Sequence, residues 1–181
     1  MSADELQELR ENAEKGRENQ SLAAVSLTMA VVAVCVAIVS LLGHRAHTEE
    51  VVLQAKSSDQ WAYYQAKNIR EHEDELFGDL SAVVASSDAA AMAKFREKAG
   101  QEAERYKHDK EEIQAEARKL EQEVATERNR ADLFDLAEVF LEIGLVVTSI
   151  TLLSGRRIFW HVGIVLSVVG VAVAVIGAIA H

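Results

Sequence analysis

Three acidic residues, Asp135, Glu138 and Glu142, stand inside an otherwise apolar stretch of the sequence. Their spacing of three and four residues places the carboxyl groups on one face of an α-helix. Ionisable groups are costly within a membrane and by default mark function there, often an ion or proton path. The chemistry that this face predicts is therefore ion binding or proton movement rather than a covalent reaction.

The depth of these carboxyl groups follows from the length of the stretch that holds them, residues 133–154. Its acid-free part, residues 143–153, covers only about 16 Å as a helix, roughly half of a hydrocarbon core of about 30 Å. A helix that spans the core must carry Glu142 to about mid-membrane. Glu138 then lies about 6 Å further along and Asp135 near the opposite interface.

Two interpretations of this acidic face remain open. No Lys or Arg occurs within the apolar stretches, so the carboxyl groups are protonated, hydrated in a cavity or bound to a cation. In the first interpretation they line a cation or proton path, as rings if several subunits surround an axis. In the second, a protonated Glu142 bonds to hydroxyl groups such as that of Thr148, or to backbone, and is only structural.

Two further apolar stretches, residues 21–43 and 158–180, are each long enough to cross a bilayer as helices. A cleaved signal peptide is excluded for the first, because its apolar core is too long and residues 1–20 carry six acids against three bases. The sequence predicts an all-α membrane protein with three transmembrane helices, preceded by a short amphipathic helix in residues 1–20.

Residues 44–132, here called the arm, are rich in charge, with 14 bases and 20 acids, and the whole chain has no proline. Apolar residues recur every seven positions on both halves of the arm, which predicts a long extramembrane antiparallel helical hairpin of coiled-coil type. Gly78 and residues 81–88 supply its turn, and Ser87 or Asp88 caps the second helix. The predicted packing residues are Ala55, Ala62, Ile69, Leu76 and Val83 on the first half, and Met92, Ala99, Ala103, Tyr106, Ile113, Ala117, Leu120, Val124 and Ala131 on the second.

Small residues form a stripe on each of the two outer membrane segments. Membrane helices associate through close packing of such residues, since lipid is as apolar as leucine. The stripes join helices of one subunit or of several. Because the predicted hairpin is rich in alanine and buries little surface, further copies of the chain would add to its packing, which favours a homo-oligomer. The helix-packing candidates are Ala30, Ala33 and Ala37 in the first stripe, and Gly163, Ser167, Gly170, Ala174 and Gly177 in the second.

An aromatic cluster, Trp61, Tyr63 and Tyr64, follows the first apolar stretch. It either packs within or between hairpins, or forms a recognition patch for lipid headgroups or a protein partner. The net charge of −10 argues against nucleic acid as a partner. We expect no metal site, since His44 and His47 lack a third ligand, and no cofactor or enzymatic activity, since no nucleophile–base constellation occurs.

The segments SDQWAYYQAKNIRE (58–71) and RADLFDLAEVFLEIGLVVTSITLLSGRRIFWHVGIVLSVVGV (130–171) resemble a bacterial family of small three-span membrane proteins, described as a domain of unknown function. The resemblance implies a bacterial inner membrane and supplies no site residues. Short basic segments, with Arg156 and Arg157 in one of them, predict a cytoplasmic N-terminus and a periplasmic arm. The expected function is a homo-oligomeric membrane scaffold, and the alternative is a cation or proton channel.

Overall fold

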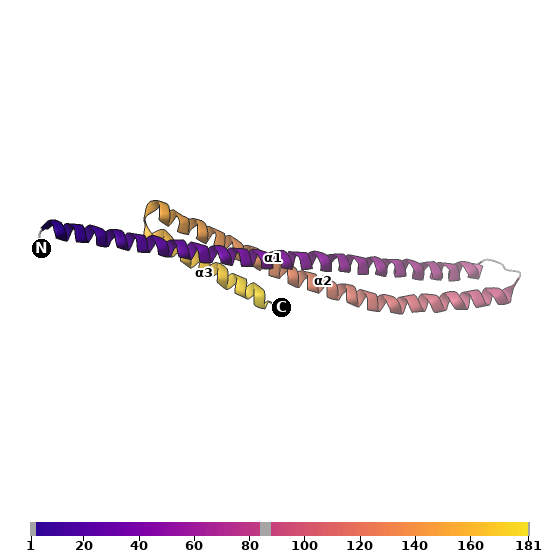
Figure 1. The fold of residues 1–181 in the computed structure, drawn as a ribbon. Coiled ribbons are helices and arrows are strands. Elements are labelled where there is room, and N and C mark those ends of the chain that lie inside the picture. The colour runs from indigo at the N-terminus through magenta and orange to yellow at the C-terminus, as the bar shows by residue number, and fades with distance from the viewer. Residues whose placement is uncertain (1–2, 84–87, 181) are drawn as a thin grey trace. The chain divides into compact units, whose positions relative to one another are not determined.

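The structure is a computed structural model that describes residues 3–83 and 88–180, with side chains from residue 22 onward. It holds three helices, α1 (Ala3–Val83), α2 (Ala89–Ser154) and α3 (Arg157–Ile179) (Figure 1). Within the described ranges there is no strand, so the predicted all-α class is confirmed. All three helices are long and apolar enough to span a membrane.

The helix ends have identifiable causes. Asp88 caps α2, because its Oδ1 accepts hydrogen bonds from the backbone N–H groups of Ala90 (3.1 Å) and Ala91 (2.9 Å). At the other end of α2, Gly155 has a φ of 66°, a left-handed conformation that glycine adopts without a Cβ clash. Its N–H donates to the carbonyl oxygen of Thr151 at 2.9 Å. The chain can then reverse into α3.

The predicted start of the turn in the arm is wrong. Gly78 was expected to begin it, but α1 continues through Gly78 and ends only at Val83. A single glycine costs a helix only about 0.5–1 kcal/mol relative to alanine, which the rest of this helix compensates. Ser87, the other expected cap, lies outside the described residues.

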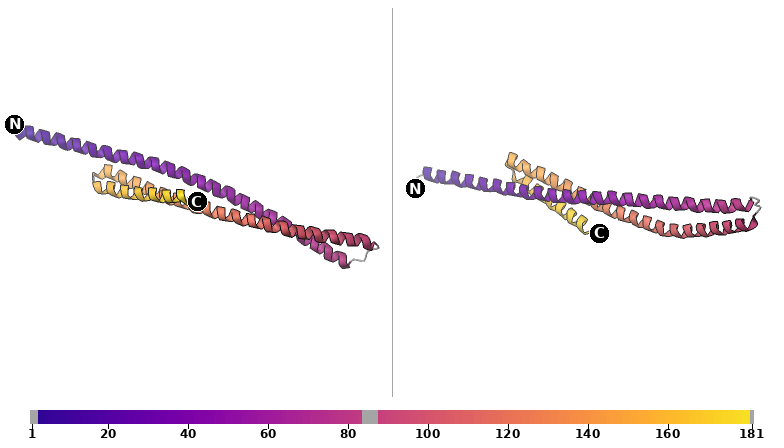
Figure 2. Two further views of the ribbon diagram at one scale, coloured as in Figure 1. Left: turned by 90° about the horizontal axis from the view of Figure 1, so that it is seen from below. Right: turned by 45° about the vertical axis from the view of Figure 1, so that its right-hand side comes forward.

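The chain forms two compact units. The first comprises residues 1–47 and 126–181, and its core packs α1 against α2 and α3. Phe134, Ala137 and Leu141 of α2 are fully buried there. Figure 2 shows α3 turning back along the end of α2. The buried members of this core are Val32, Val39, Ala46, Ala131, Phe134, Ala137, Leu141 and Ala174.

The second unit, residues 48–125, pairs the end of α1 with the start of α2. Ser81 contacts Arg96, Lys67 contacts Asp109, and Trp61 contacts Glu121, so positions rise along one segment as they fall along the other. On α2 the expected packing positions are confirmed, since Ala99, Ile113, Ala117 and Val124 are buried and Met92, Ala103, Tyr106 and Leu120 are half-buried.

On α1 the expected packing face of the second unit is wrong. All five predicted residues, Ala55, Ala62, Ile69, Leu76 and Val83, are exposed. The buried residues are instead Leu53, Ser57, Glu71 and Ser81. The reason is that polar side chains of α1 find partners on α2, whereas the prediction counted only aliphatic side chains. The aliphatic stripe of α1 in this unit is left facing outward.

Candidate functional site

The acidic face of α2 is the site with the clearest chemical potential, and its three carboxyl groups have different surroundings. Asp135 is exposed and its Oδ2 lies 3.1 Å from Nε2 of His47 on α1. Glu138 is half-buried and Glu142 is exposed. Within the described ranges, neither glutamate has a hydrogen bond or an ion pair. The three residues therefore share a helix face without forming one closed cluster.

Glu142 stands among apolar side chains on the outside of the first unit. Its neighbours in sequence Val139, Ile143 and Val146 are exposed as well. A carboxyl group on such a surface is costly within a bilayer unless it meets water, a cation or another protein surface. In the part of the chain that the structure describes, no group of three or more metal-ligating side chains occurs. The face is thus open rather than assembled into a cavity within one chain.

The contact between His47 and Asp135 was not anticipated from the sequence. In the sequence, His47 stands out only as half of a weak metal motif with His44. Its pairing with Asp135 joins residues 88 positions apart, so no local pattern reports it. The only hint in the sequence is that a histidine and an acid stand at the ends of neighbouring apolar stretches, where they could pair.

The two small-residue stripes have different surroundings. All five stripe residues of α3, Gly163, Ser167, Gly170, Ala174 and Gly177, are buried. A Cβ atom on Gly170 would lie 2.9 Å from the carbonyl oxygen of Ala137 on α2, which is closer than real Cβ contacts. One on Gly144 of α2 would lie 2.9 Å from the carbonyl oxygen of Gly163. The absence of side chains is therefore what lets the backbones of α2 and α3 approach.

The stripe of α1 is not used in this way. Ala30, Ala33 and Ala37 are exposed, and α1 instead buries the valines Val25, Val32 and Val39. Contact between α1 and α3 includes a hydrogen bond from Trp160 Nε1 to Thr28 Oγ1 at 3.2 Å. Nearby, a groove of about 260 Å³ is lined by Thr28, Val31, Val32, Cys35, Leu141, Ile164, Ser167, Val168 and Val171.

The aromatic cluster lies at the pairing of the two helical segments in the second unit. Trp61 Nε1 donates a hydrogen bond to Glu121 Oε1 at 2.9 Å, and its ring meets that of Tyr64 edge-on at 5.5 Å. Tyr63 is half-exposed. These contacts support packing within the pair for Trp61 and Tyr64, which are half-buried, and Tyr63 is the most exposed of the three.

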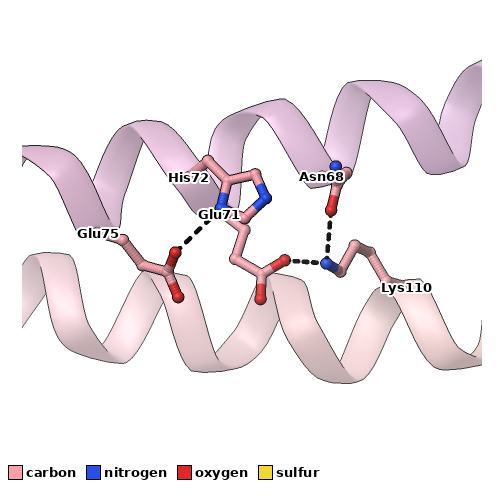
Figure 3. A network of polar contacts seen from close by, with 5 residues as sticks. All are labelled: Asn68, Glu71, His72, Glu75 and Lys110. Atoms are coloured by element: carbon pink, nitrogen blue, oxygen red, sulfur yellow. Dashed lines mark hydrogen bonds and ion pairs between the residues drawn. The ribbon is translucent and has the colours of Figure 1, made fainter.

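A polar ladder lies next to this cluster, and no local pattern in the sequence predicts it. Lys67 donates to Asp109 at 2.8 Å, and its ammonium group lies 4.9 Å from the ring centre of Tyr106. The hydrogen bond to Asp109 raises the pKa of Lys67, and the same bond lowers the pKa of Asp109. Lys110 donates a hydrogen bond to Asn68 Oδ1 and forms an ion pair with the carboxylate of Glu71, as Figure 3 shows.

The comparisons with known proteins identify a family. The family described as "Domain of unknown function (DUF4337)" matches residues 21–180. The chain belongs to this family. It matches none of the curated proteins and no solved structure. The DUF4337 match covers all three apolar stretches together with the second unit, so both the acidic face and the polar ladder lie within the family domain.

Proposed function

We propose that this DUF4337 chain is a non-enzymatic membrane protein of the bacterial inner membrane, a homo-oligomeric scaffold from which the arm projects. The exposed small-residue stripe of α1 carries the proposal. Small residues favour close approach of membrane helices, and α3 illustrates such packing against α2. Ala30, Ala33 and Ala37 present the same kind of surface, and no helix in the described part of the chain covers them. A second copy is the partner that every membrane containing this protein supplies.

Cysteine cross-linking tests this interface, because Cys35 is the chain's single cysteine and can be replaced. In a Cys35→Ser background, we expect Ala33→Cys and Ala37→Cys to form disulfide-linked dimers in native membranes upon mild oxidation. The matched controls are Val31→Cys and Ile38→Cys, which are exposed on another face of the same helix, since neither is three or four residues from any of the three alanines. Equal cross-linking of all four variants, or none, would contradict the interface.

In the proposed orientation the N-terminus is cytoplasmic and the arm, residues 44–132, is periplasmic. The basic turn at Arg156 and Arg157 supports it, because short basic loops favour the cytoplasmic side. A membrane-impermeant thiol reagent checks it on intact cells. We expect labelling of Gly100→Cys in the Cys35→Ser background and no labelling of Arg156→Cys, and the reverse pattern would invert the topology.

A second candidate function is cation or proton conduction, which the exposure of Glu142 favours. Within one chain this carboxyl group faces outward, so an ion path requires further copies that bring several Glu142 residues around an axis. We expect the wild type to carry a cation or proton flux in proteoliposomes and Glu142→Gln to change it without altering cross-linking at Ala33. Absence of wild-type flux, or the same flux in both proteins, would contradict conduction and leave the scaffold as the only proposed function.

A further inference from the structure

The end of the second unit nearest residues 83 and 88 exposes an unusual amount of apolar side chain. Phe77 on α1 and Phe95 on α2 are 52% and 48% exposed, and Leu76, Leu80 and Val83 are exposed with them. Contiguous apolar patches on a soluble surface commonly mark a binding site. We call these five residues the tip patch.

The tip patch contains a pocket. It has a volume of about 370 Å³, lies between the two helical segments and includes both phenylalanines. Its remaining lining residues are Asp74, Lys98, Ala99 and Glu102, so two carboxylates and one ammonium group surround the aromatic rings. An aromatic pocket with an excess of carboxylate suits a cationic side chain that carries an apolar stem, because ring faces and carboxylates both attract the cation.

The charge around the patch selects the partner. The first part of the second unit, residues 48–83, has eight acids and three bases. Around the patch itself, residues 70–83 of α1 hold five acids and one base. Residues 89–102 of α2 hold two acids and three bases, so the acids stand in excess and are concentrated on α1. The net negative charge disfavours an anionic bilayer and also a second copy of the same acidic α1 surface. It attracts a basic partner.

We propose that the tip patch docks a basic amphipathic helix of another protein, with one Lys or Arg side chain inserted between Phe77 and Phe95. The apolar face of that helix covers Leu76, Leu80 and Val83, and its basic face meets the acids of residues 73–79. In a helix-in-groove arrangement the partner's apolar anchors recur at one-turn spacing, and Leu76 and Leu80, one turn apart on α1, offer them an apolar surface of matching spacing. The inference rests on the proposed role of the arm in reaching a partner and names that partner's chemistry.

The test uses the full chain in phosphatidylcholine nanodiscs and two immobilised synthetic helices. One helix combines leucine and lysine, and the other has glutamate in place of every lysine. With the signal of empty nanodiscs subtracted, we expect binding to the lysine helix only, weakened by salt. Phe77→Ala with Phe95→Ala should weaken it by about tenfold or more, as loss of buried aromatic anchors does.

Two further variants separate docking from misfolding. Asp74→Asn with Glu102→Gln keeps the shape of both side chains, and we expect it to weaken binding severalfold. The matched control, Val51→Ala with Val52→Ala, removes exposed apolar groups from the same helix away from the pocket and should bind as the wild type does. Helicity by circular dichroism should be the same in all of them.

Three results would overturn the proposal: equal binding of both synthetic helices, no binding above empty nanodiscs, or pocket variants that bind like the control. Loss of oligomers in the phenylalanine variant would assign the patch to a second copy, and association with anionic vesicles that these variants abolish would assign it to lipid. Cross-linking at Ala33 is measured separately, so a failed scaffold interface and a failed docking site give different outcomes.

Discussion

The carboxylate of Glu71 forms an ion pair with the ammonium group of Lys110 although both side chains are nearly buried, at 8% and 14% exposure. Lys110 also donates to Asn68 Oδ1 at 2.7 Å (Figure 3). A pair of charges removed from water contributes little net stability, because desolvation offsets their attraction. Breaking such a pair is costly, because one charge is then buried without its partner. A shift of one helical segment along the other would break the pair, so the pair favours the observed register.

We expect Glu71→Leu to reduce the free energy of unfolding by about 3–5 kcal/mol, because it leaves the Lys110 ammonium buried without its carboxylate. The double change Glu71→Leu with Lys110→Leu should recover most of the loss. Urea unfolding of the detergent-solubilised chain, followed by circular dichroism, measures both. A single variant as stable as wild type would show that water reaches Lys110.

The pair of Lys67 and Asp109 predicts a pH dependence. Because the folded pKa of Asp109 is lowered, its stabilising contribution is present above the unfolded pKa of about 4 and is lost as pH falls through the folded value. Because the pKa of Lys67 is raised, its contribution is lost only as pH rises through that folded value, above about 10. We therefore expect Asp109→Asn to be less stable than wild type at pH 7, with the difference shrinking toward pH 2.

Thermal melts at several pH values test this prediction. Asp132→Asn, an exposed carboxyl group elsewhere on α2, is the matched control and should show no such convergence. A constant difference between Asp109→Asn and wild type across the acid range would show that the pair does not titrate as a unit.

The close approach of α2 and α3 predicts sensitivity at Gly163. A Cβ atom there would collide with Thr148 and lie 2.7 Å from the carbonyl oxygen of Gly144. We expect Gly163→Leu to lower stability by about 1–3 kcal/mol or more, as overpacking does. Gly100→Leu is the control, since no atom lies within 4 Å of its Cβ position. Unfolding by sodium dodecyl sulfate titration distinguishes them, and equal stability would contradict this packing.

The cap of α2 predicts a smaller effect. Asp88→Ala removes the acceptor of the Ala90 and Ala91 N–H groups and should cost about 1 kcal/mol, with Asp88→Asn close to wild type. Hydrogen exchange of the first turn of α2 reports this directly. Faster exchange after Asp79→Ala, a change of an exposed acid outside the cap, would show that charge alone is responsible.

Some of the structure followed from local sequence. The absence of proline and the long apolar stretches predict long helices, because helical hydrogen bonds form within one segment and do not need a distant partner. Asp88 was one of two cap candidates that the local sequence offered, and the packing positions of α2 follow its apolar seven-residue spacing. The positions of Asp135, Glu138 and Glu142 on one face follow from helix geometry alone.

Which face of α1 packs in the second unit was decided only by the tertiary structure. Its aliphatic stripe at Ile69 and Leu76 has heptad spacing, yet the chain buries Glu71 and Ser81 instead. Those polar side chains become favourable to bury only when Lys110 and Arg96 lie opposite them, at least 15 residues away along the chain. Local periodicity shows which face of a helix is most apolar, whereas the face that packs also depends on the side chains of the opposite helix. For α1 in the second unit, the most apolar face and the packed face are different.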